Sequence, residues 1–157
     1  MFRDGTVKDV VIRPAARHSD ERGWLMELFR ADGVSPEHMP VMAYVSMTRP
    51  GVVRGPHEHL DQADCFCFFG PSDFKVYLWD NRALSPTYMV RQVVEAGESA
   101  PAVIIVPKKV VHAYRNTGNR DGLVINCPNR LFKGHGRIDP VDEVRYEDVL
   151  DSPFRMD

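Results

Sequence analysis

The sequence has little cysteine, no long apolar run and no strong excess of charge. Its three cysteines, Cys65, Cys67 and Cys127, are too few for a disulfide framework in 157 residues. It has no apolar run of about 18 residues, and the opening residues lack the apolar core of a signal peptide. A formal net charge of -2 gives no reason to expect a nucleic acid or a membrane surface as a partner. These absences predict a cytoplasmic protein.

Helical periodicity is also scarce, because no segment keeps a helical apolar period beyond about two turns. Residues 143–150 are expected as either one short helix or an extended tail. Short runs rich in Val, Ile, Phe and Tyr recur instead, with Gly, Pro, Asn and Asp between them. These runs predict strands at 7–14, 23–30, 41–48, 65–69, 74–80, 88–94, 102–106 and 123–127.

So many short strands in a chain of single-domain length predict an all-β fold, with one domain over residues 1–157. A sandwich or barrel is expected, since closure or a jelly roll removes exposed strand edges. Within 74–80, Phe74, Val76 and Leu78 alternate with other residues, which is typical of a strand with two different faces. Cys65 and Cys67 lie two residues apart, so we expect them on one face of a strand as small buried hydrophobes.

The densest group of polar residues surrounds His57 and His59. These histidines are two residues apart, so in extended backbone their imidazoles face the same side. Asp64 enters the next strand and can reach that side. His112 follows the apolar run 102–106 and a turn, so it can project into the mouth of a barrel. Titratable groups that converge in a concave pocket predict a functional site.

The same residues carry a family resemblance, because five short motifs follow one another in order along most of the chain. The motifs are Asp20-Glu-Arg-Gly-Trp-Leu-Met-Glu27, Arg54-Gly-Pro-His57, Asp80-Asn-Arg82 with Ser85-Pro-Thr87, Pro107-Lys-Lys-Val-Val-His112, and Asp139-Pro140. They resemble the D-x-R-G-x-x-x-E, R-G-x-H, D-x-R…S-P-T, P-x-x-x-x-H and D-P motifs of the dTDP-4-dehydrorhamnose 3,5-epimerase family. Each motif is short, and it is their order and spacing that carry the resemblance.

The resemblance implies a cupin-type jelly-roll barrel or sandwich and a homodimer. Strand exchange is expected for about residues 7–30, the barrel core for about 41–128, and a short irregular or helical tail for 129–157. The implied substrate is a nucleotide-linked 4-keto-deoxy sugar of polysaccharide or deoxysugar biosynthesis. The implied reaction is epimerisation at C3, C5 or both, without a cofactor or metal.

The resemblance also implies roles for single residues. Proton abstraction beside a ketone needs a base with a pKa near neutrality, which histidine supplies, often oriented by a carboxylate. By the family pattern His57 is this base, and Asp151 in the tail orients it. Arg54 binds the nucleotide end, together with Arg22 and Glu27 from the exchanged strand of the partner.

We expect His59, Asp64, His112 and Phe132 to line the sugar pocket. Two of these positions depart from the family. Where the family has a lysine, about ten residues after the base, this chain has Asp64 and its neighbours, and the family's acid tyrosine aligns with Phe132. A phenyl ring cannot donate a proton. Epimerisation at one carbon, a different acid such as Tyr114, another sugar and loss of catalysis therefore remain open.

Two rival interpretations use the same cluster. His57, His59, Asp64 and His112 are similar to the ligand pattern of metal-binding cupins, and three imidazoles with one carboxylate suit Fe(II), Mn(II), Ni(II) or Zn(II). That pattern usually has Glu where this chain has Asp64 and Gly where it has Lys109. The second rival is a sugar-nucleotide-binding module without catalysis.

Overall fold

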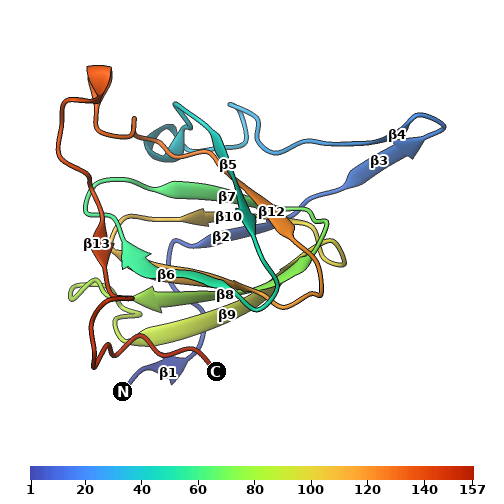
Figure 1. Cartoon of the computed structure of the whole chain (residues 1–157). Helices are drawn as coiled ribbons and strands as arrows, with labels where there is room; N and C mark the ends of the chain where they lie inside the picture. Colours follow the sequence, from blue (N-terminus) through green and yellow to red (C-terminus); the bar gives the residue numbers. More distant parts are fainter.

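Two β-sheets face each other in the computed structural model, which describes residues 1–157 (Figure 1). The first sheet has the strand order β1 (Arg3–Asp4), β9 (Val90–Gly97), β8 (Asp73–Asp80), β11 (Val110–Asn116), β6 (Val53–Glu58) and β13 (Val144–Arg145). The second has the order β2 (Val11–Pro14), β10 (Ala102–Val106), β7 (Asp64–Phe68), β12 (Gly122–Asn126) and β5 (Tyr44–Thr48). The expected all-β sandwich is confirmed.

Four short elements lie outside the two sheets. Strands β3 (Arg17–Asp20) and β4 (Gly23–Met26) pair only with each other, and their hairpin projects away from the sandwich (Figure 1). Two short 3-10 helices, η1 (Pro36–His38) and η2 (His135–Arg137), lie in the connections. The structure contains no helix with the length and apolar character needed to span a membrane.

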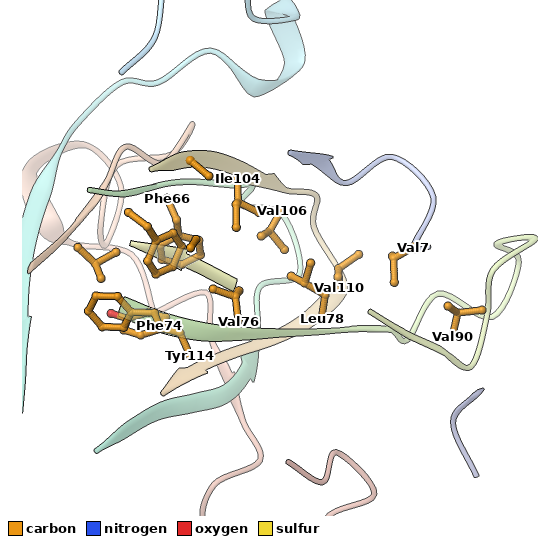
Figure 2. Close-up of a cluster of buried hydrophobic side chains, with 14 residues drawn as sticks. Val7, Phe66, Phe74, Val76, Leu78, Val90, Ile104, Val106, Val110 and Tyr114 are labelled. Carbon is orange, nitrogen blue, oxygen red and sulfur yellow. The ribbon is translucent and has the colours of Figure 1, made fainter. Parts of the chain in front are cut away.

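The main core fills the space between the sheets (Figure 2). Phe74, Val76 and Leu78 of β8 point into it, and the intervening Tyr77 and Trp79 pack on the opposite face, where Phe154 of the tail covers them. The two different faces predicted for this strand are therefore confirmed. The end of the chain is held in place because Phe154 packs on the outer face of the first sheet.

The cysteines are buried in an apolar cluster, as the sequence predicts for Cys65 and Cys67. Cys65 and Cys67 share the outer face of β7 and are buried with Cys127 in a small apolar cluster. All three thiols are free. These residues therefore contribute buried apolar surface to the second sheet.

The two histidine-bearing segments form neighbouring strands, which the sequence did not reveal. Strand β6 pairs directly with β11, with His57 opposite His112, and the register shifts between His112 and Tyr114. Gly55 lies at this irregularity with φ +85°, and a Cβ atom there would lie 2.5 Å from the carbonyl oxygen of His112. Only glycine allows this approach of the two backbones. Glycine and proline in residues 51–56 otherwise read as loop residues, which explains the missed strand.

The tail after residue 129 contains no helix at 143–150. Residues Val144 and Arg145 form β13, which pairs with β6 opposite Glu58 and His57. The extended alternative is therefore the correct one. This pairing brings the residues just before β13 to the histidine cluster.

Candidate active site

A cavity of about 1560 Å³ opens between strands β5 and β6 and the segment 128–143. Its walls carry apolar, aromatic, histidine and charged side chains. The lining includes Tyr44, Ser46, Arg54, His57, His59, Phe66, Tyr114, Phe132 and Glu143. A concave pocket with convergent titratable groups is the arrangement expected of a binding or catalytic site.

Three imidazoles gather beside this cavity: His57 and His59 line it, whereas His112, like Asp64, is buried and does not reach the lining expected for it. The rings of His57 and His112 are 4.5 Å apart between centroids, as expected for opposed residues on paired strands. The ring of His59 lies 5.7 Å from His57 and 5.8 Å from His112. The convergence predicted from the sequence is present, although it arises from adjacent strands of one sheet and not from strands that face each other.

Asp64 lies behind the histidines as a fully buried carboxylate at the start of β7. Its Oδ2 atom lies 3.2 Å from His59 Nε2 and 3.3 Å from His112 Nε2. Its Oδ1 atom accepts hydrogen bonds of 2.8 Å from Gln62 Nε2 and Asn126 Nδ2. Burial alone would raise the pKa of Asp64, but the interactions with His112 and His59 hold it well below its usual value.

His59 is held on both sides of its ring. Its Nδ1 atom faces the backbone carbonyl of Asp142, and its Nε2 atom faces Asp64. Burial would lower the pKa of His59, but the hydrogen bond and charge of Asp64 outweigh it and raise the pKa to about 9. The carboxylate of Asp142 accepts bonds from the backbone N–H groups of Leu60, Asp61 and Gln62, which fixes the loop that carries His59.

His57 binds a proton more weakly than an ordinary histidine. Burial, together with positive charge at His112 and His59, lowers its pKa to about 2, so its ring is neutral at neutral pH. A neutral imidazole has a lone pair available to accept a proton. The carboxylate that faces it is Glu143, with Oε1 3.9 Å from His57 Nδ1.

Asp151 does not occupy the place expected for it. It is exposed in the tail and is absent from the cavity lining, whereas Glu143 lies against His57 because β13 pairs with β6. Arg145 binds the other Glu143 oxygen at 2.7 Å. No motif in the sequence points to Glu143, and only the pairing of β13 with β6 brings it to His57.

Two phenols line the same cavity, with Tyr114 buried and Tyr44 partly exposed. Tyr114 Oη lies 3.0 Å from Ser46 Oγ, and burial raises its pKa. Tyr44, which the sequence analysis did not single out, accepts a 2.8 Å hydrogen bond from Asn126 Nδ2. Burial and the negative charge of Asp64 raise the pKa of Tyr44 to about 12. Both side chains therefore keep their protons at neutral pH.

Phe132 lines the cavity from the segment after β12 and is half exposed. Arg54 lines it from β6, and its guanidinium is held by Thr48 Oγ1 at 3.0 Å and by the carbonyl oxygen of Met47 at 2.8 Å. These contacts leave Arg54 with no carboxylate partner, so its positive charge is available to an anionic ligand.

Arg22 and Glu27 do not reach the cavity of their own chain. Arg22 is exposed in the β3–β4 hairpin, where it pairs with Asp20, and Glu27 follows the hairpin and is also exposed. Neither lines the cavity. Their expected role at the nucleotide end therefore requires a second copy of the chain and stays a prediction.

Comparison with known proteins identifies the family. Residues 4–138 match the family model described as dTDP-4-dehydrorhamnose 3,5-epimerase. The chain belongs to this family. A probable low-salt glycan biosynthesis epimerase, Agl13 from Haloferax volcanii, is 38% identical over 128 residues, which cover 80% of this chain and 81% of the relative. The spore coat polysaccharide biosynthesis protein SpsL from Bacillus subtilis is 35% identical over 112 residues, 71% of this chain and 73% of the relative.

Solved structures share the fold of this family member. A dTDP sugar isomerase from Desulfovibrio desulfuricans has a TM-score of 0.78 at 22% identity, covering 95% of this chain and 91% of that chain. The epimerase RmlC from Legionella pneumophila, in complex with dTDP-4-keto-L-rhamnose, has a TM-score of 0.70 at 20% identity, covering 97% and 82%. The family resemblance and the cupin-type fold expected from the sequence are both confirmed.

Proposed function

We propose that the protein epimerises a nucleotide-linked 4-keto-deoxy sugar, with His57 as the base that removes the proton beside the ketone. One observation carries this assignment: a neutral imidazole lines a large cavity, with a carboxylate 3.9 Å from its other nitrogen. The family membership supports the reaction class, and the ligand dTDP-4-keto-L-rhamnose of the Legionella structure supports this class of substrate.

The reaction begins when the lone pair of His57 takes the proton from the carbon next to the carbonyl. The C–H electron pair forms a carbon–carbon double bond, and the carbonyl oxygen takes up the negative charge of an enolate. Return of a proton to the opposite face of that carbon restores the ketone and inverts the centre. The negative charge of the enolate forms near His57 and favours the imidazolium. It therefore raises the pKa of His57 from its low value as the proton is transferred.

Glu143 has the positioning role that the family pattern implied for Asp151. It faces His57 Nδ1 and offers a counter-charge to the imidazolium that proton abstraction creates. Arg145 holds the carboxylate in place through its second oxygen. A carboxylate beside a histidine base both orients the ring and stabilises its charged form.

Tyr114 is the acid that returns the proton in this proposal. It lines the cavity, keeps its proton because burial raises its pKa, and lies on β11 two residues from His112. Phe132 occupies another part of the wall and has no proton to give. With Tyr114 as the acid, we expect inversion of one carbon, so the products differ from those of a full 3,5-epimerisation.

The nucleotide end of the substrate lies against cationic side chains at the cavity mouth. Arg54, Arg130, Lys133 and Arg137 line it, and none of them has a carboxylate partner in the chain. Guanidinium groups match the geometry of phosphate oxygens. We place the diphosphate of the substrate here, and in a dimer the partner subunit's Arg22 and the partner subunit's Glu27 complete this end.

Exchange of substrate hydrogen with solvent tests the base. The wild type, incubated with dTDP-4-keto-6-deoxyglucose in D₂O, should incorporate deuterium beside the ketone, read by mass spectrometry. The His57→Asn variant should lose this exchange by at least about a hundredfold, as expected for loss of a general base, while dTDP still binds. His38→Asn, a change at a half-buried histidine that does not line the cavity, is the matched control and should exchange normally. Wild-type exchange by His57→Asn would exclude His57, and binding without any exchange by the wild type would favour the non-catalytic module.

A further inference from the structure

We propose that Tyr44 is a further catalytic residue, whose phenol donates a hydrogen bond to the enolate oxygen that forms when His57 removes the substrate proton. This inference rests on the proposed function and adds the group that stabilises the enolate. Tyr44 lines the cavity from β5 and is 46% exposed, and the one hydrogen bond of its side chain within the protein is to Asn126. A reaction through an enolate is aided by a donor held where the negative oxygen develops.

The hydrogen bonds of Asn126 determine which way the Tyr44 hydroxyl donates. The backbone N–H of Cys65 donates to Asn126 Oδ1 at 3.1 Å, and this contact identifies the amide oxygen because a backbone N–H can only donate. Asn126 Nδ2 then faces Asp64 Oδ1 and Tyr44 Oη, each at 2.8 Å. The two hydrogens of this nitrogen serve these two acceptors. Tyr44 therefore accepts a hydrogen from Asn126, and its own hydroxyl hydrogen is available to a ligand in the cavity.

The residues behind this phenol are buried, which fixes its orientation. Asn126 is 2% exposed and Asp64 is 1% exposed, and Tyr44 lies opposite Asn126 in the pairing of β5 with β12. Asp64 stands where the family has a lysine, but it does not line the cavity. Its carboxylate orients Asn126, and Asn126 in turn orients the phenol that does line the cavity. A donor oriented before charge develops needs no reorganisation during the reaction.

The charges around Tyr44 suit a neutral donor near the base. Burial raises the pKa of Tyr44 to about 12, and the negative charge of Glu143 adds to this rise. Tyr44 is therefore close enough to sense Glu143, the carboxylate that lies 3.9 Å from His57 Nδ1. Tyr114 differs, because its hydroxyl already has a partner in Ser46 Oγ at 3.0 Å. The two phenols therefore have separate roles, with Tyr44 at the enolate oxygen and Tyr114 as the acid at carbon.

Separate measurement of proton removal and of inversion tests Tyr44. Tyr44→Phe and wild type are compared with dTDP-4-keto-6-deoxyglucose in D₂O for deuterium wash-in and for inverted product. Both steps pass through the enolate, so we expect both rates to fall together by about a hundredfold, with KM within a few-fold of wild type. Tyr88→Phe, a change at an exposed tyrosine outside the cavity lining, is the matched control and should keep both rates. An unchanged Tm will show that Tyr44→Phe is folded.

The outcomes separate this role from the proposed function. Normal wash-in by Tyr44→Phe, with exchange still abolished in His57→Asn, would overturn the role of Tyr44 and leave His57 as base. Loss of inverted product with normal wash-in would also overturn it, because Tyr44 would then be the acid at carbon. A raised KM with an unchanged kcat would reduce Tyr44 to a binding residue. Incorporation of 3-fluorotyrosine at position 44 keeps the phenol and should restore both rates, and failure of this rescue would count against a donor. No exchange by the wild type would instead reject the proposed function.

Discussion

At the residue scale, some groups of the site can be identified from the sequence, and others approach it only because of the fold. His57, His59, Asp64 and His112 could be chosen from the sequence because clustered histidines and a carboxylate are rarely needed for packing alone. Glu143 could not, since its approach to His57 depends on the pairing of β13 with β6. Asp151 lies exposed outside the cavity lining for the same reason: the spacing of the tail gives no information about its path.

Phe132 is the residue whose replacement should add a function. The Phe132→Tyr change places a phenol on the cavity wall, and a phenol with a pKa of about 10 can donate a proton to a carbanion. We expect a higher ratio of inverted product to deuterium wash-in, by about threefold to tenfold, which NMR of the sugar protons will measure. Phe132→Leu is the control and should keep the wild-type ratio. Full 3,5-epimerisation by the wild type would contradict this expectation, because the acid already present would then need no phenol at position 132.

At the scale of elements, the close approach of β6 to β11 positions the histidines. The strongly apolar strands β7, β8 and β10 were predictable from side-chain pattern, whereas β6 was not, because its glycine and proline are typical of loops. Backbone pairing with β11 and β13 holds it in place instead. The position of the base therefore depends on a strand that has weak propensity of its own.

Gly55, the one glycine of β6, should be highly sensitive to substitution. Gly55→Ala adds a Cβ atom 2.5 Å from the carbonyl oxygen of His112 in a backbone with φ +85°. We expect a loss of about 2–4 kcal/mol in the free energy of unfolding, from strain and from displacement of the strand. Gly51→Ala is the matched control: its φ is +73°, but no atom lies within 4 Å of the added Cβ. Urea unfolding will measure both, and equal losses would show that strain alone accounts for the effect.

At the scale of the whole molecule, strands β3 and β4 pair only with each other, and their hairpin meets the sandwich where Trp24 lies 6.3 Å from Phe69 between ring centroids. It projects from the sandwich (Figure 1), and its Trp24 and Leu25 side chains are 51% and 63% exposed. The Arg22 guanidinium at its turn pairs only with Asp20. Exposed apolar side chains next to unused binding groups are expected where another chain completes the structure.

Mixing two inactive variants tests whether the hairpin of one copy completes the cavity of another. Arg22→Ala damages the hairpin and His57→Asn damages the cavity, so each homodimer should have little activity. In a heterodimer, the cavity that retains His57 receives the hairpin that retains Arg22, and one intact site forms. Random exchange of subunits should then restore about a quarter of the wild-type activity per chain. Light scattering at micromolar concentration will establish the dimer, and exchange of substrate deuterium will measure the recovery. A strictly monomeric protein, or a mixture no more active than its components, would mean that Arg22 does not act across a dimer.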